Sequence, residues 1–185
     1  FILQNYQKNL KNIYFCTTMS NVKMPKRKYS SKSLKRAMNL FPPLLVNRIM
    51  ITEADSDFKK LRVTIKYSWL NKNIQKSIFG GSIFSAVDPF YAVMYWQIFN
   101  TRNIPMVIWI KKAEIDYIKT ATSNLYMDFE LKENDIENAI SALKENEKYE
   151  VWHTVKVYNS KHDICAESRV LVYIQNKYKR SLNNL

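Results

Sequence analysis

Hydrophobic and polar residues follow one outstanding pattern near the middle of the chain. The segment Ile83–Phe99 is almost wholly apolar, and its one charged residue is Asp88. A helix without a polar face is typically buried in a protein core. Because Asp88, Pro89 and Gln97 interrupt the run, we expect a core helix and no transmembrane segment. The pattern therefore predicts a central buried helix over about residues 81–99.

Segments of alternating apolar and polar residues surround this helix and predict β-strands. One such segment precedes the helix and four follow it. The expected strands span residues 61–68, 106–120, 125–132, 150–158 and 164–175. In the second of these the alternation changes phase after Ile110, which indicates a β-bulge. A central helix followed by a run of antiparallel strands predicts an α+β fold, in which one curved sheet wraps around the helix.

Two further helices are expected outside the central one. Serine residues before residues 31–41 can cap a helix that Pro42 ends. Residues 135–147 have apolar positions at the spacing of one helix face, so an inserted amphipathic helix is expected there.

The charge of the chain is concentrated at its two ends. The formal net charge is +13, but residues 1–48 contain ten Lys and Arg with no acid, while residues 49–176 contain 16 of each sign. We expect a disordered basic leader (residues 1–29), a single domain (30–176) and a basic tail (177–185). The folded part is therefore not a basic nucleic-acid-binding domain. The arms could contact acidic lipid, RNA, a phosphorylated cofactor or an acidic carrier protein, or they could simply be solvated.

Cysteine and histidine usage gives little support for a metal site. The two cysteines, Cys16 and Cys165, are far apart, and the histidines are only His153 and His162. Without metal-like spacing or a disulfide framework, the usage suits a reducing compartment. We expect a cytoplasmic protein with no metal and no bound cofactor. His153 lies in an alternating segment and is interpreted as a strand residue with a satisfied hydrogen bond.

The glycines point to a candidate chemical site. The chain has only two glycines, Gly80 and Gly81, and they are adjacent at the start of the expected central helix. Backbone N–H groups at a helix N-terminus are unpaired and lie at the positive end of the helix dipole, so they can stabilise an oxyanion. Glycine lets a substrate approach that backbone closely. A carboxylate such as Asp88, two turns along a buried helix, becomes a stronger base or nucleophile when it is desolvated.

These residues resemble a known family. The spacing Asn73, six residues, Gly80-Gly81, six residues, Asp88 resembles the active site of hotdog-fold acyl-CoA thioesterases of the phenylacetic-acid-pathway type. The wider stretch Gly-Gly-Ser-Ile-Phe-Ser-Ala-Val-Asp-Pro is similar to the hotdog branch of unknown function called DUF4442. The resemblance implies a hotdog fold, hydrolysis of an acyl-CoA or acyl-carrier thioester, and a homodimer or dimer of dimers. It also implies that Gly80 or Gly81 forms the oxyanion hole, Asp88 is base or nucleophile, and Asn73 positions water or substrate.

Several alternatives stay open at this point. The family usually has His before the glycine pair, where this chain has Phe79, so a non-catalytic hotdog protein that binds acyl groups or a small ligand is the second hypothesis. Asp88 followed by Pro89 could cap a separate helix, or Pro89 could kink one continuous helix. Asn73 could simply form a turn.

Overall fold

The computed structural model describes residues 29–104 and 106–176. Apart from Tyr29, the expected basic leader lies outside the described residues, and so does the whole expected tail. No helix in the described part of the chain is long and apolar enough to cross a membrane.

In the described chain, one or more helices precede each of three pairs of strands. The elements are α2 (Ser31–Asn39), α3 (Pro42–Val46), β1 (Ile49–Ala54), β2 (Lys60–Ile65), the 3-10 helix η2 (Trp69–Asn71), α4 (Gly80–Val87), α5 (Phe90–Thr101), β3 (Met106–Tyr117), β4 (Leu125–Glu130), α6 (Glu133–Glu145), β5 (Lys148–Asn159) and β6 (Ile164–Asn176).

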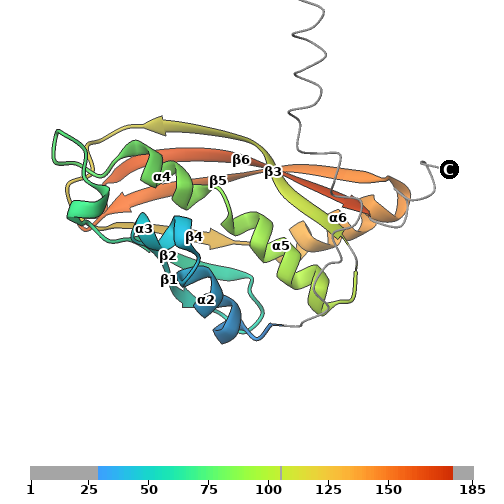
Figure 1. Cartoon of the computed structure of the whole chain (residues 1–185). Helices are drawn as coiled ribbons and strands as arrows, with labels where there is room; N and C mark the ends of the chain where they lie inside the picture. Colours follow the sequence, from blue (N-terminus) through green and yellow to red (C-terminus); the bar gives the residue numbers. More distant parts are fainter. Residues whose placement is uncertain (1–28, 105, 177–185) are drawn as a thin grey trace, which may run out of the picture.

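The strands form one six-stranded sheet in the order β1-β2-β4-β5-β6-β3. Every neighbouring pair is antiparallel. The sheet curves around α4 and α5, which lie against one face of it, and β1 and β3 form its two edges (Figure 1). The expected α+β arrangement of a curved antiparallel sheet around a central helix is confirmed.

The five expected strands are present with small changes of boundary, and the sheet contains one more. The predicted bulge is confirmed, since the register of β3 against β6 shifts between Ile110 and Lys112. The additional strand is β1. It was not predicted because only Ile49 and Ile51 alternate clearly before the acidic residues begin. The apolar piece ahead of it forms the short helix α3, and Arg48, with a φ of 61°, turns the chain into β1.

The central helix is not continuous, which corrects the prediction of one helix over residues 81–99. It consists of α4 and α5, separated by Asp88 and Pro89. Because Pro89 has no N–H group, it cannot donate the helical hydrogen bond to the carbonyl of Ser85. Both separating residues keep right-handed helical backbone angles. The helix is therefore interrupted without a loop.

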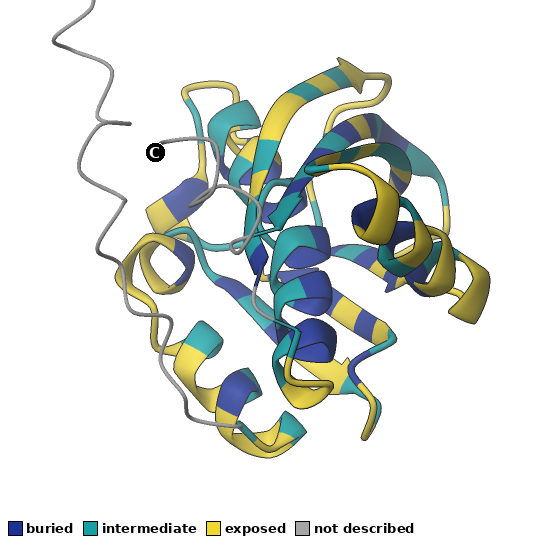
Figure 2. Cartoon of the chain, turned by 90° about the vertical axis from the view of Figure 1, so that its right-hand side faces the viewer, coloured by how far each residue is buried: buried dark blue, intermediate teal, exposed yellow. Residues whose placement is uncertain are grey.

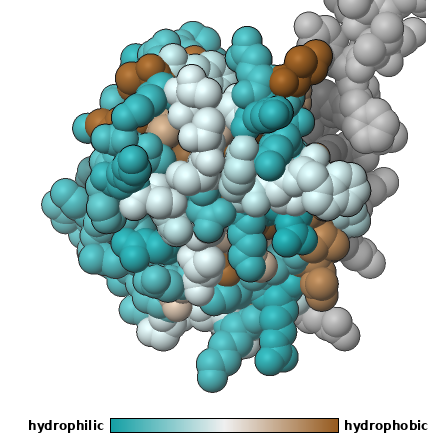
Figure 3. Space-filling view, turned by 90° about the vertical axis from the view of Figure 1, so that its left-hand side faces the viewer, coloured by the Kyte–Doolittle hydropathy of each residue, from teal (hydrophilic) through white to brown (hydrophobic). Residues whose placement is uncertain are grey.

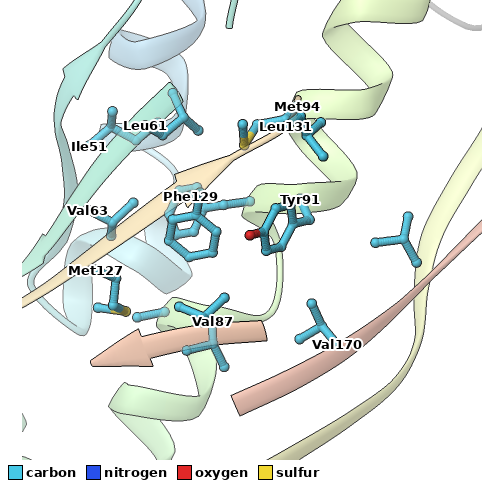
Figure 4. Packing of buried hydrophobic residues seen from close by; sticks show 14 of the residues in the cluster. Ile51, Leu61, Val63, Val87, Tyr91, Met94, Met127, Phe129, Leu131 and Val170 are labelled. Carbon is cyan, nitrogen blue, oxygen red and sulfur yellow. The ribbon is translucent and has the colours of Figure 1, made fainter. Parts of the chain in front are cut away.

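The core lies between α5 and the concave face of the sheet. Phe90, Met94 and Tyr95 of α5 are fully buried. The ring of Tyr91 meets that of Phe129 from β4 edge to face, with centroids 5.3 Å apart. Figure 4 shows the two side chains next to each other. In Figure 2 the buried residues of α5 lie enclosed at the centre, while the outer helices show exposed surfaces. Burial of one such large apolar side chain contributes about 1.5–3 kcal/mol, so this cluster fixes α5 against the sheet.

Candidate active site

The two glycines form the first turn of α4, as the resemblance implied. The N–H groups of Ser82 and Ile83 both donate to the carbonyl of Phe79, at 2.9 and 3.3 Å. Within residues 29–104 and 106–176, by contrast, no acceptor pairs with the N–H groups of Gly80 and Gly81. These two amides therefore keep the hydrogen-bonding capacity that an oxyanion requires.

Aromatic rings of the chain itself fill the space beside both glycines. A Cβ atom on Gly81 would lie 2.3 Å from Cε1 of Phe79, and one on Gly80 would lie 3.2 Å from Cζ of Tyr117. The Tyr117 hydroxyl also donates to the carbonyl of Gly80 at 2.9 Å. Neither glycine has a positive φ, so close approach of the rings, and not backbone freedom, is what requires glycine here. From the sequence we expected a substrate to occupy the space beside the two glycines. In the structure the ring of Phe79 occupies the space beside Gly81.

Phe79 differs from Tyr117 in how firmly it is held. The Phe79 side chain is 56% exposed. Tyr117 is also exposed, but its hydroxyl is bonded to the helix. Phe79 can therefore change rotamer without breaking a hydrogen bond, and Tyr117 cannot.

A buried asparagine holds the start of α4 in place. The Asn71 amide nitrogen donates to the carbonyls of Asn47 and Lys66, both at 3.0 Å. The backbone carbonyl of Asn71 accepts a hydrogen bond from the backbone N–H of Phe79 at 2.8 Å. Ser82 of α4 donates its hydroxyl to Oδ1 of Asn47 at 2.6 Å. These bonds connect α3, the loop after β2 and the first turn of α4 into one polar network.

Sequence reasoning missed this network. Its members are far apart in the chain, and only the isolated hydroxyl of Ser82 within an apolar helix gave a signal. Asn47 and Asn71 each look like ordinary loop residues in the sequence.

Asn73 lies in the same loop but uses its side chain locally. Its Oδ1 accepts from the N–H of Ser77 at 3.1 Å, and its Nδ2 donates to the Ser77 hydroxyl at 2.8 Å. The backbone N–H of Asn73 donates to the Ser77 carbonyl at 2.8 Å. The geometry favours the turn-forming alternative, because both ends of the Asn73 amide are engaged within five residues.

Asp88 lies at the other end of α4, half-buried. Its carboxylate has no hydrogen-bond donor and no cation as partner in the described part of the chain. The alternative of a separate second helix is confirmed, but Asp88 is not its N-cap: Pro89 takes that position, and Asp88 is the C-cap residue of α4 with right-handed helical backbone angles. Burial raises the pKa of the Asp88 carboxyl above its ordinary value. The group is thus a partly desolvated base without a partner.

Spacing along α4 limits the chemistry that this carboxylate can perform. Gly81 and Asp88 are seven residues apart on the same helix face, so their Cα atoms are separated by about 10 Å. Direct attack on a carbonyl whose oxygen is bound by the glycine amide would need a carboxylate within about 7 Å of that amide. One intervening water molecule extends the reach to about 10 Å. The arrangement therefore suits a base acting through water better than a nucleophile.

A second polar group in the core belongs to the fold and not to this site. The hydroxyl of Tyr95 and Nε2 of His153 are 3.2 Å apart, and the ring of Tyr91 stacks on His153 at 4.2 Å. Burial lowers the pKa of His153 and raises the pKa of Tyr91 to about 12, so both are neutral at neutral pH. The predicted hydrogen-bonded strand histidine is confirmed. No three His, Cys, Asp or Glu side chains among the described residues are grouped as metal ligands.

Solved structures with the same architecture identify the class of fold. PA5026 from Pseudomonas aeruginosa, a protein of unknown function described as a probable thioesterase, superposes with a TM-score of 0.72 at 12% identity, covering 81% of this chain and 98% of that one. The thioesterase HI1161 from Haemophilus influenzae gives 0.60 at 8% identity, covering 82% and 94%. The PaaI protein of the Escherichia coli phenylacetic acid degradation operon gives 0.55 at 14% identity, covering 76% and 89%. These likenesses concern the fold, and they confirm the predicted hotdog fold.

The sequence places the chain within this class. The model of the DUF4442 family, a domain of unknown function, matches residues 30–174. The chain therefore belongs to the DUF4442 family. No curated protein matches it.

Proposed function

We propose that this protein hydrolyses an acyl thioester. One observation carries the proposal: two amides at the start of α4 lie two helical turns from a half-buried carboxylate, and none of these groups has a partner among the described residues. The amides suit the oxygen of a thioester carbonyl, and the carboxylate suits activation of water. The similarity in fold to HI1161 and PA5026 gives independent support.

In the proposed reaction the thioester carbonyl oxygen accepts a hydrogen bond from the N–H of Gly80 or Gly81. Asp88 removes a proton from a water molecule, and the water oxygen forms a bond to the carbonyl carbon. The carbon–sulfur bond then breaks, giving a carboxylic acid and a thiolate. A thiol has an ordinary pKa near ~8.5, so the thiolate leaves without strong acid assistance. The reaction written this way uses no metal and no cofactor.

Substrate and assembly are further parts of the proposal. We favour acyl-CoA, or an acyl carrier protein, because both are acidic and the chain carries a net charge of +13. We also propose a homodimer or dimer of dimers, since β3 leaves a twelve-residue strand at the sheet edge next to the candidate site. In this scheme Asn73 positions the loop that leads into Phe79 and does not contact the substrate.

The position of Phe79 favours a second candidate function, the binding of an acyl group or small apolar ligand without turnover. Its ring occupies the side of Gly81 on which a Cβ atom would project. If Phe79 keeps this position, the chain binds a ligand beside the ring but does not hydrolyse it.

The test is release of free thiol from short, medium, long and aromatic acyl-CoAs. We expect Asp88→Asn to lower turnover at least about a hundredfold, because the base is removed while the shape of the site is kept. Asp116→Asn is the matched control, since Asp116 is an exposed carboxylate on β3, and its turnover should equal that of the wild type. The wild-type rate should also rise with pH through a pKa above the ordinary range of Asp.

Two results would decide against the hydrolase. Absence of turnover on every thioester by the folded wild type would leave the ligand-binding function. Equal turnover by the wild type and Asp88→Asn would show that another group activates water.

A further inference from the structure

A surface next to the candidate site combines exposed apolar side chains with cations. The short helix α3 is apolar along its whole length, yet it buries only Leu44. In the loop around η2, Trp69 is 81% exposed and Ile74 is fully exposed. We call this surface the α3–η2 face; its apolar members are Leu40, Phe41, Leu45, Val46, Trp69, Leu70 and Ile74, and its cations are Arg36, Arg48, Lys66, Lys72 and Lys76.

The two segments of this face adjoin each other. The side chain of Asn71, in η2, donates to the carbonyl of Asn47 directly after α3, and the N–H of Lys66 donates to the carbonyl of Arg48. In Figure 1 α3 and the loop between β2 and α4 lie toward the same end of the molecule. Figure 3 looks at this end and shows separate hydrophobic groups among hydrophilic ones.

The cations of the α3–η2 face have no acidic neighbours in the sequence. Residues 29–52 and 58–87 contain no Asp or Glu. Among the ion pairs of the described residues, none involves Arg36, Arg48, Lys66, Lys72 or Lys76.

The outer face of the sheet is different. Lys60, Arg62, Lys111, Lys112 and Arg169 each lie within 4.0 Å of a carboxylate. The charges of these five cations are thus paired within the chain, and those of the α3–η2 face are not. The described part of the chain supplies no anion for this face.

The chemistry of the face selects its partner. A second copy meeting it about a two-fold axis would place like charges against each other. A nucleic acid would match the cations but would leave the exposed aliphatic side chains without a function. An anionic lipid surface matches both, because lysine and arginine attract its head groups, tryptophan favours the interface, and aliphatic side chains enter the acyl boundary.

We propose that the α3–η2 face docks on an anionic lipid bilayer. Residues 1–28 add six Lys and Arg and no acid, which strengthens the attraction to the same surface. The proposal does not depend on the hydrolase proposal, since it uses none of the candidate catalytic groups. It would place the start of α4 next to the lipid, because the backbone of Asn71, in η2, bonds to that of Phe79.

The first test is sedimentation of the full chain with vesicles of phosphatidylcholine, with and without phosphatidylserine. We expect binding only to the phosphatidylserine vesicles, and weaker binding as salt is raised. Reversal of two exposed face cations, Lys72→Glu with Lys76→Glu, should weaken binding tenfold or more. The matched control, Lys132→Glu with Lys148→Glu, has the same net charge and changes exposed lysines on either side of α6, so its affinity should change twofold or less. Equal effects of the two pairs would overturn the proposal, because they would show dependence on total charge alone.

The second test follows the apolar members. Trp69 is the most exposed large aromatic residue among those that the structure describes, so its fluorescence should shift to shorter wavelength when phosphatidylserine vesicles are added. Trp69→Phe should still bind but lose that shift, and Trp69→Ser with Ile74→Ser should lose most binding while unfolding at the wild-type temperature. If the double serine variant instead converts a dimer to monomers in light scattering, a second copy covers this face and the proposal is wrong. Binding equal to the wild type would overturn it as well.

Discussion

The two halves of the central helix differ in what the chain provides for them. In α5 Met94 is fully buried and the hydroxyl of Tyr95 meets His153, and among its described side chains only Oε1 of Gln97 is buried without a partner. In α4 the first two amides and the carboxylate that follows the helix have no partner in the part of the chain that the structure describes. Both helices bury apolar side chains in the core, so the difference lies in their polar groups. The polar groups at the ends of α4 contribute little to stability, and a substrate could supply their missing partners.

The largest expected effect separates the two halves by stability. Met94→Ala removes a fully buried side chain of α5 and should lower the free energy of unfolding by about 2–5 kcal/mol. Phe84→Ala removes a side chain of α4 that is 38% exposed, and we expect a loss of about 1 kcal/mol or less. Urea unfolding of both variants measures the difference. Equal losses would mean that the outer face of α4 is packed as firmly as the core face of α5.

A smaller effect tests the contact of Phe79 with Gly81. Gly81→Ala should lower the free energy of unfolding by about 1 kcal/mol, because the new Cβ forces the half-exposed ring to move. In a Phe79→Ala background the same substitution should instead stabilise the helix by about 0.5–1 kcal/mol, since alanine restricts the unfolded chain more than glycine. The four proteins form a double-mutant cycle. Additive changes would show that the ring does not rest on Gly81 in solution.

The smallest expected effect concerns Asp88 and pH. Its pKa is raised in the folded state, so between the ordinary and the raised pKa the folded state binds more protons than the unfolded state. Stability therefore falls as pH rises through that interval, and the full loss is present at neutral pH. Asp88→Asn should raise Tm at pH 7, by a few degrees at most, and the difference should shrink as the pH falls past the ordinary Asp pKa of about 3.9.

Asp116→Asn serves again as the control in that measurement. Its carboxylate is exposed, so its Tm difference from the wild type should show no such trend. A lower Tm for Asp88→Asn at neutral pH would mean that the charged carboxylate has a stabilising partner, and the asymmetry between α4 and α5 would be smaller than the structure indicates.

The sequence predicted most of the fold because alternation and apolar runs report which face of an element is buried. The bulge in β3 followed from a change of phase after Ile110. The strand β1 was missed because its alternation is too short to separate from the apolar residues of α3. Whether Asp88 and Pro89 divide or only kink the helix was left open, since a proline after an acidic residue is compatible with both.

The site was less predictable, because periodicity does not identify partners across the chain. The ring that covers Gly80 comes from Tyr117, 37 residues further on, and the asparagine that fixes the start of α4 is Asn71. The motif spacing pointed to Asn73 instead. Two asparagines so close in sequence cannot be ranked without knowing that one reaches α3 and the other folds back on Ser77.

The interruption at Pro89 also affects how the central helix can unfold. Since no hydrogen bond passes from Pro89 to Ser85, we expect that α4 can open without α5. An eight-residue helix is too short to be stable alone, so α4 depends on its contacts with α3 and β2. Opening of α4 consequently ends at the proline, and the amides of α5 stay protected against hydrogen exchange while those of α4 exchange with solvent.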